Sequence, residues 1–361
     1  MYGATLLALV FSIQTLIGGV LSIISGVLSD TYGRKPMILL GSSMGLLGVL
    51  FFFLYLTLSS PIVGILFIIG IIIYFSAGSV SGAASNALLT ESISENYLGR
   101  ASSFLSISFI GSIVLGSIFF PFLTQWYGLL FSLVLSLILV TLFFFSRLFL
   151  IETLRKKVKE GSIREFFLNS MKSIKYTFTK KEVSFLSLYV VVGGLFTGIS
   201  VFLPSYLKDV MHLRDEIIGL YFSLSAIIST IAQPLGGWFV DKFGGKLGMI
   251  IDGLVEGTIL IIFAFLSIFM PFLALTVLLI NSAFDPFYSS GYIVFIKNYT
   301  NEEERGKVFG GMTSLRLFPS SLSPILVGII WNINPLLIFL VAGVAMFPRV
   351  YLLFLIKGGE I

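Results

Sequence analysis

Residues 26–36 read GVLSDTYGRKP, and this short stretch interrupts a chain that is otherwise strongly apolar. A long apolar run ends at Asp30, the chain turns over Gly33, two basic residues follow, and a second apolar run begins. A similar stretch, GGWFVDKFGGKLG, occupies residues 236–248. A plain stop signal between two membrane spans needs only basic residues. The aspartate and the spaced glycines therefore predict a tight, charged corner between two closely packed helices.

The composition predicts that lipid is the solvent of this chain. Of its 361 residues 57% are hydrophobic and 11% are charged, with a mean hydropathy of +1.03, whereas soluble domains carry roughly 25% charged residues. The chain has no cysteine, which excludes disulfides, thiol catalysis and cysteine metal sites. The net charge of +5 does not indicate nucleic acid, because the charged residues sit in short gaps between apolar runs.

Eleven apolar segments are long enough to cross a bilayer, since about 20 helical residues span the hydrocarbon. Each is too long and too uniformly apolar for a transmembrane strand. The sequence therefore predicts an all-α integral membrane protein. The predicted spans are about 5–28, 37–58, 62–89, 101–124, 128–147, 183–206, 216–240, 247–269, 272–296, 308–330 and 335–356.

The basic residues predict the orientation of these spans. If the loop after Asp30 is cytoplasmic, 19 of the 23 lysines and arginines lie in cytoplasmic loops, whereas the outer loops hold Lys208 and Arg214. The central loop and the C-terminus are then cytoplasmic. The gap at residues 148–182 is too short for a domain core, and two interpretations stay open. It is either an amphipathic helix on the inner leaflet or a solvated charged linker.

The two corner motifs indicate an internal repeat, which is common in secondary transporters. Corresponding glycines, aspartates and lysines are separated by 211 residues, and a second pair of inner-loop arginines is separated by 205. The paired residues are Gly26 and Gly237, Asp30 and Asp241, Gly33 and Gly244, Lys35 and Lys246, and Arg100 and Arg305.

The first motif resembles the signature loop between the second and third helices of the major facilitator superfamily, and the second resembles its weaker copy. The resemblance implies a two-bundle transporter fold in which a carboxylate at the inner end of the fourth helix, here Glu91, joins the signature cluster. We expect a gating cluster of Gly26, Asp30, Gly33, Arg34, Lys35 and Glu91, with Arg100 nearby. The expected second-half copy contains Gly237, Asp241, Gly244, Lys246 and Arg305, but Gly245 stands where the first motif has Arg34.

The resemblance also implies a domain division. The family has six helices in each half, whereas this sequence predicts five spans before the central loop and six after it. We expect an N-terminal bundle at 1–147 (equivalent to family helices 2–6), a cytoplasmic linker at 148–182 and a C-terminal bundle at 183–361 (helices 7–12). The first span would then correspond to the family's second helix, so that the first helix is missing.

Charged residues inside spans are rare and energetically expensive, which makes them candidates for proton or substrate binding. Asp285 lies just before Pro286, on the span that the resemblance matches to the family's cavity-lining tenth helix, and it is the first candidate, with an ion pair to Arg316 as the structural alternative. Glu256 and Asp252 share a helix face, and pairing with basic groups at the inner end is their alternative role. Polar residues near Asp285 complete the candidate set, namely Asn281 and Tyr288. We expect Arg349 to extend toward the inner membrane surface.

These features predict a secondary transporter that moves a small solute by alternating access, with protons as a possible second ligand. A metabolite symporter and a drug exporter stay open, and a transporter-like sensor or a non-transporting remnant is the alternative. We expect no enzyme activity, because no nucleophile–base or metal constellation is visible in the sequence. We expect no cofactor, no metal and no nucleic-acid partner, and a monomer in the plasma membrane.

Overall fold

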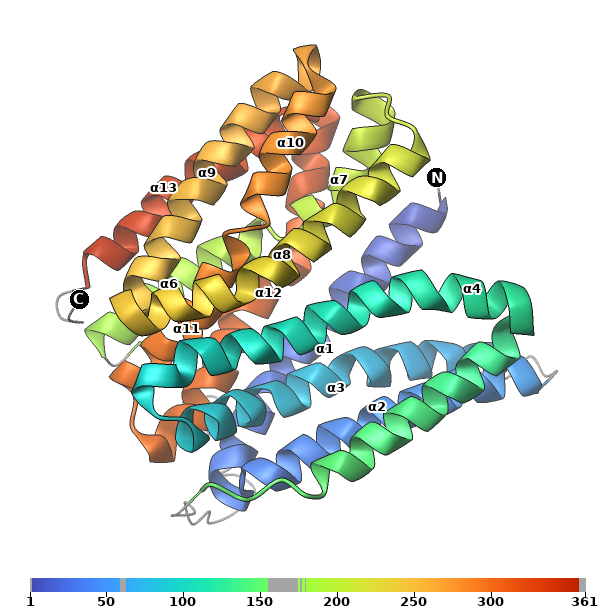
Figure 1. The fold of residues 1–361 in the computed structure, drawn as a ribbon, viewed down its shortest axis with the longest axis vertical. Helices are drawn as coiled ribbons and strands as arrows, with labels where there is room; N and C mark the ends of the chain where they lie inside the picture. The colour runs from blue at the N-terminus through green and yellow to red at the C-terminus, as the bar shows by residue number, and fades with distance from the viewer. Residues whose placement is uncertain (1, 59–62, 155–174, 176, 179, 357–361) are drawn as a thin grey trace.

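The computed structural model describes residues 2–58, 63–154, 175, 177–178 and 180–356 and is helical along nearly all of this length (Figure 1). Eleven of its helical segments are long and apolar enough to cross a membrane, which confirms the predicted number of spans. The N-terminal helices are α1 (Tyr2–Tyr32), α2 (Arg34–Thr57), α3 (Val63–Ser92) and α4 (Leu98–Arg147). The C-terminal helices are α6 (Lys181–Leu195), α7 (Ile199–Ser205), α8 (Asp215–Phe243), α9 (Gly245–Phe269), α10 (Pro271–Asn281), α11 (Asp285–Tyr299), α12 (Arg305–Ile333) and α13 (Leu337–Phe354).

Three short helices complete these elements. Two 3₁₀ turns, η1 (Glu95–Tyr97) and η3 (Glu302–Glu304), come directly before α4 and α12, and a π-helical turn, η2 (Tyr206–Val210), follows α7. Helix α4 contains two spans, because Gly128 adopts φ 85° and ψ 162° and turns the chain back on itself. Positive φ is a conformation that glycine adopts without a steric penalty.

The two sets of helices meet mainly through two pairs, α1 with α12 and α4 with α8, and also through α4 with α11 and α3 with α12. Figure 1 shows α4 and α8 close together at the left and diverging to the right. The left side is also where the chain turns between α1 and α2, α3 and α4, α8 and α9, and α11 and α12. We call this side the charged end, since both quoted motifs lie there.

Glycines form the two motif corners as the spacing predicts. Gly33 separates α1 from α2 with φ 119°, and Gly244 separates α8 from α9 with φ 87°. Because both residues have the same backbone role at corresponding positions, the repeat is present in the structure as well as in the sequence.

Two predicted spans are broken near their centres. The span at 183–206 is split into α6 and α7 by a turn at 196–198, and the span at 272–296 is split into α10 and α11 by a turn at 282–284. Glycines surround the first break, and Pro286, which has no N–H to donate, is the second residue of the helix after the second break. A break inside lipid needs new partners for its free backbone groups. The Ser323 hydroxyl on α12 supplies them at the first break, because it donates to the Leu195 carbonyl at 2.6 Å and accepts from the Gly198 N–H at 2.7 Å.

The outer faces of the helices are apolar and open. Trp126, Phe109 and Ile231 are each about 70% exposed, and many other large apolar side chains lie beside them. A water-soluble protein would not expose apolar surface on this scale, so these faces fit a hydrocarbon solvent.

Only the beginning and scattered residues of the predicted linker at 148–182 belong to the described part of the chain, and the amphipathic helix proposed there lies largely outside it. The domain boundaries at 147 and 182 and the missing first helix stay predictions.

Replacing Ser323 with alanine should destabilise the protein by about 1–3 kcal/mol, because it leaves a buried N–H and a buried C=O at the α6–α7 break without partners. Thermal unfolding in detergent would measure the loss. Ser320→Ala is the matched control, because the Ser320 hydroxyl bonds only to a carbonyl of its own helix. Equal melting temperatures for the two variants would contradict this role of Ser323.

Candidate functional site

Asp30, Arg34 and Glu91 form one buried ion network at the corner between α1 and α2. Arg34 lies within ion-pair distance of Asp30, and its Nη2 donates to Glu91 Oε1 at 2.8 Å. Asp30 and Arg34 are both 0% exposed. Arg34 Nη1 also donates to the Ser29 hydroxyl at 3.0 Å. The structure thus brings together the three charged residues that the resemblance groups.

Asp30 also crosses to the other set of helices. Its carboxylate accepts from the backbone N–H groups of Gly306 at 3.1 Å and Lys307 at 2.8 Å, in the first turn of α12. These amides have no partner within the helix, and the helix dipole favours a negative charge there. Arg34 Nη2 crosses in the same place and donates to the Glu302 carbonyl at 3.0 Å.

In the second motif, an aspartate of the C-terminal set of helices caps a helix of the N-terminal set. Asp241, at the end of α8, accepts from the backbone N–H groups of Gly99 at 2.5 Å and Arg100 at 3.1 Å, in the first turn of α4. Arg100 Nε adds a salt bridge to Asp241 at 2.8 Å. Each aspartate therefore caps a helix of the other bundle, and we call these contacts the crossed caps.

Two sequence expectations about this region are wrong. Arg100 was expected beside the Asp30 cluster, but it binds Asp241 of the second motif, because it belongs to the helix end that Asp241 caps. Arg305 was expected to belong to the second copy, but it lies at the start of α12, on the side of the first cluster, with a buried Nε that has no hydrogen-bond partner. The true counterparts of Gly99 and Arg100 are Gly306 and Lys307.

Glycines allow the backbones at the crossed caps to approach closely. A Cβ on Gly26 would collide with the Gly306 carbonyl, and a Cβ on Gly237 would collide with the Gly99 carbonyl and the Ser103 hydroxyl. The predicted glycine spacing is thus required by the packing of α1 on α12 and of α8 on α4.

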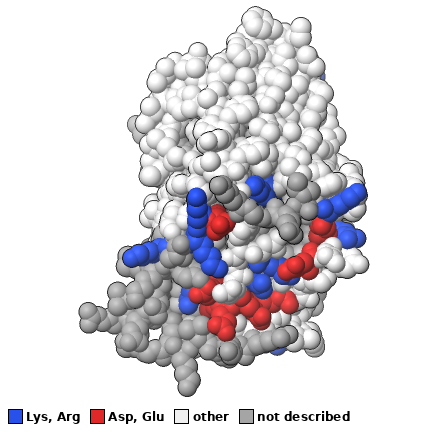
Figure 2. All heavy atoms as spheres, turned by 90° about the vertical axis from the view of Figure 1, so that its left-hand side faces the viewer, with Lys and Arg blue, Asp and Glu red and all other residues white. Residues whose placement is uncertain are grey.

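The corresponding lysines of the two motifs, Lys35 and Lys246, are not part of the crossed caps. Lys246 Nζ donates to the Ile356 carbonyl at 2.7 Å, beyond the end of α13. The backbone N–H of Lys35 donates to Glu152. Figure 2 looks onto the charged end and shows that the basic and acidic side chains are gathered together there.

The sequence analysis missed Glu152. Its carboxylate accepts from the backbone N–H groups of Arg34 at 2.9 Å and Lys35 at 3.1 Å and so caps α2. The neighbouring Thr153 hydroxyl donates to Glu91. A lone acidic residue shortly after the last span of the first bundle was the available signal, but its distance in sequence from the motif concealed the contact.

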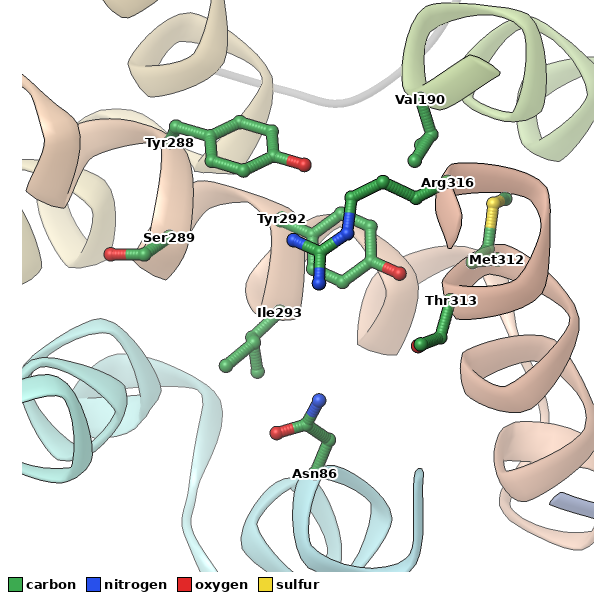
Figure 3. Close-up of a pocket in the computed structure, with 9 residues that line it drawn as sticks. All are labelled: Asn86, Val190, Tyr288, Ser289, Tyr292, Ile293, Met312, Thr313 and Arg316. Carbon is green, nitrogen blue, oxygen red and sulfur yellow. The ribbon is translucent and has the colours of Figure 1, made fainter. Parts of the chain in front are cut away.

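A cavity of about 170 Å³ lies between the two sets of helices, at the level of the spans' interior. Figure 3 shows residues from α3, α6, α11 and α12 around it, with the Arg316 side chain extending into its centre. The lining residues are Asn86, Val190, Tyr288, Ser289, Tyr292, Ile293, Met312, Thr313 and Arg316.

Two sequence candidates, Arg316 and Tyr288, therefore line the cavity directly. Asp285 is exposed at the start of α11, one helical turn before Tyr288 and Ser289. No ion pair joins Asp285 to Arg316 in the described part of the chain, so the alternative of a structural pair is not supported. Asn281 lies at the end of α10, where its buried Oδ1 has no hydrogen-bond partner.

The other intramembrane charges form a separate group inside the C-terminal bundle. Arg349 is 6% exposed, and its Nη1 lies 3.4 Å from Glu256 Oε2. Its guanidinium stacks 4.0 Å from the centre of the Tyr189 ring. The expectation that Arg349 extends to the membrane surface is wrong, because Glu256 and Tyr189 provide partners in the interior. Asp252 is buried one helical turn before Glu256.

The described residues form eleven candidate membrane spans in two sets, with charged corners at one end and a cavity between the sets, and this arrangement fits the class of multi-pass membrane transporters. The family model described as Major Facilitator Superfamily matches residues 2–324, and the chain belongs to this family. The resemblance read from the two motifs is thereby confirmed.

Individual relatives are distant. The chain is 30% identical to a probable vesicular acetylcholine transporter-B of Danio rerio over 38% of this chain and 29% of that protein. It is 24% identical to a probable nitrate transporter, NarT, of Staphylococcus epidermidis over 68% of this chain and 60% of that protein. The matches thus span less than two thirds of these curated relatives. The crystal structure of the human organic anion transporter MFSD10 has the same fold, with a TM-score of 0.80 at 18% identity, over 96% of this chain and 83% of that one.

Asp30→Ala should destabilise the protein by about 3–5 kcal/mol, because it leaves the buried Arg34 short of a counter-charge. Asp241→Ala should have a smaller effect, because Arg100 is 44% exposed and is free to turn toward solvent. Thermal unfolding of the purified variants would test this order. Asp215→Ala removes a largely exposed ion pair with Lys208 and should leave the melting temperature nearly unchanged. A larger loss for Asp241→Ala than for Asp30→Ala would contradict the assignment.

Proposed function

We propose that this protein is a secondary transporter that carries a small solute by alternating access. The observation that supports this most directly is the pair of crossed caps at one end of a polar cavity between two bundles. Each cap joins the end of a helix in one bundle to the first turn of a helix in the other. Breaking both caps would free the bundles to separate at the charged end.

A gate must hold the bundles together in one state and release them in another, and the crossed caps can do both because they consist of a few strong hydrogen bonds. Charge-assisted hydrogen bonds to a helix N-terminus contribute more than neutral ones, yet they break cleanly when the bundles part. Most cross-bundle hydrogen bonds of the described residues lie at or near the charged end, including the Ser103 and Ser290 hydroxyls 3.0 Å apart. One lies deeper, because the Ser314 hydroxyl on α12 donates to the Gly19 carbonyl on α1 at 2.5 Å. In the proposed cycle, the structure represents a state that is closed at the charged end.

We assign the charged end to the cytoplasm, because basic residues are concentrated in the loops on that side. The plasma membrane is the proposed location, and a single chain is the proposed functional unit, since the cavity is lined from both bundles of one chain. The sensor or remnant alternative predicts the same gate without net movement of solute.

The names of similar proteins leave the substrate's charge open. They include a nitrate transporter and an organic anion transporter on one side and an acetylcholine transporter on the other. We propose coupling to protons through Asp285, which is exposed one turn from the cavity-lining Tyr288 and has no ion-pair partner among the described residues. A carboxylate that is accessible and has no ion-pair partner can bind and release a proton without breaking a salt bridge.

The gate can be tested with engineered cysteines, because the natural chain has none. Oxidising Ser103→Cys/Ser290→Cys should join α4 to α11 across the interface and stop solute exchange in proteoliposomes, and reduction should restore it. Thr124→Cys/Ser132→Cys is the matched control, because its hydroxyls, 3.2 Å apart, lie within the N-terminal bundle. Continued exchange by the oxidised cross-bundle pair would overturn the alternating-access proposal.

Asp285→Asn tests the coupling proposal. The variant should retain solute exchange between equal concentrations but lose accumulation driven by an imposed pH gradient, because an amide does not bind the transported proton. Uptake into proteoliposomes with and without the gradient would measure both. Asp215→Asn, an exposed site, is the control. Unchanged gradient-driven accumulation by Asp285→Asn would remove this residue from the coupling mechanism.

A further inference from the structure

Arg316 occupies a position that is energetically costly for a cation. It lies 11 residues after the start of α12, which places it roughly 16 Å from the charged end of a 29-residue helix. A charge at this depth is rarely kept unless it has a partner or a function. We therefore expect a negative charge that balances Arg316.

Four other arginines in or at the ends of the spans have partners among the described residues. Arg34 binds Asp30 and Glu91, Arg100 binds Asp241, and Arg349 binds Glu256. Arg147 donates to the Ser42 hydroxyl and stacks on Phe143.

Arg316 differs from all of these. Its guanidinium forms no ion pair or hydrogen bond with any described residue, and the side chain is exposed within the cavity. Its five N–H donors in a planar fork are thus free for a ligand.

The residues around Arg316 complement an anion. The cavity lining contains one cation and no acidic side chain. Tyr288, Tyr292, Ser289 and Thr313 bring hydroxyl groups, and Asn86 brings an amide from the other bundle. Figure 3 shows the Asn86 and Thr313 side chains and the two tyrosine rings on different sides of Arg316, whereas the Ser289 hydroxyl points away from it and donates to the Pro286 carbonyl. A ligand held by both Arg316 and Asn86 would therefore contact both bundles.

The cavity also limits the size of the ligand. About 170 Å³ holds far more than the roughly 10–15 Å³ that one water molecule needs, but it is smaller than the roughly 300–1,000 Å³ of drug-sized sites. Tyr288 and Tyr292 have ring centres 6.0 Å apart and present flat surfaces beside the guanidinium. A small planar group fits this space better than a bulky one.

We propose that the cavity binds a small anion with a planar oxyanion group, such as a carboxylate or nitrate, and that Arg316 is its principal ligand. The inference rests on the proposed transport function and names its substrate class. A planar oxyanion accepts two parallel N–H bonds from a guanidinium, which provides orientation as well as charge balance. Arg349 does not share this role, because Glu256 already neutralises it within the bundle.

Binding to the purified full-length chain tests the proposal directly. Sodium nitrate and sodium acetate are the two anionic probes, and choline chloride at equal ionic strength is the cationic comparator, with sodium chloride as the reference. Calorimetry and the ligand-dependent shift in melting temperature report binding to the folded state. We expect nitrate or acetate to bind the wild-type chain and choline not to bind.

Variants then locate the site. Arg316→Gln should weaken anion binding by roughly 10- to 100-fold, since it removes a charge-assisted contact, and Arg316→Lys should lose less. Arg214→Gln removes the same charge from an outer loop and should bind as wild type does. Arg316→Gln should also unfold no more readily than wild type without anion, because it leaves no partner unpaired. A lower melting temperature would assign Arg316 to structure instead.

The inference is overturned if neither anion binds the wild-type chain, if choline binds more tightly than both anions, or if Arg316→Gln binds as wild type does. Transport assays separate it from the function on which it rests. Anion binding through Arg316 without movement of any probe across vesicles would contradict transport and leave the binding site intact. Transport of choline but of neither anion would support a transporter and refute the anion site.

Discussion

The arrangement of this molecule depends on the carboxylates that accept hydrogen bonds from the first turn of a helix in the opposite bundle. Helix N-termini carry free N–H groups and a positive dipole end, and packing keeps water away from these two, since Asp30 is 0% and the Asp241 side chain 4% exposed. Asp30 and Asp241 supply acceptors at such sites on α12 and α4. Each bundle supplies one aspartate and one helix N-terminus, so the two contacts hold the bundles together at the same end of the molecule.

Charge pairing inside lipid explains the rest of the polar interior. Positive side chains in the spans are balanced by carboxylates at the corners and in the C-terminal bundle, and the glycines and Ser323 satisfy the geometric demands of close packing and broken helices. The cavity is where this balance is left open, because Arg316 faces polar groups rather than a carboxylate. A membrane protein keeps such an imbalance at a cost, and a ligand of the opposite charge is its simplest justification.

The sequence was a good guide wherever a local pattern determined the outcome. Hydropathy determined the number of spans, and the requirement for positive φ determined the corners at Gly33 and Gly244. It was a poor guide to contacts between distant segments. The partner of Arg100, the capping role of Glu152 and the interior location of Arg349 all depend on which helices become neighbours. The helix break at 196–198 was also missed, because Ser323, which satisfies it, lies over a hundred residues away.

Asp30 and Asp241 accept hydrogen bonds from main-chain amides. Every residue except proline supplies such an amide, which affects which substitutions these sites tolerate. The amide is present whatever the side chain is, so the capping bond at Lys307 does not depend on which side chain the residue carries, as long as the helix begins there. Proline is the exception, since it has no N–H. Bulk is the other restriction at Gly306 and Gly99, where an added methyl would strike the aspartate itself. A closure built in this way depends on the path of the backbone more than on the chemistry of the capped residues.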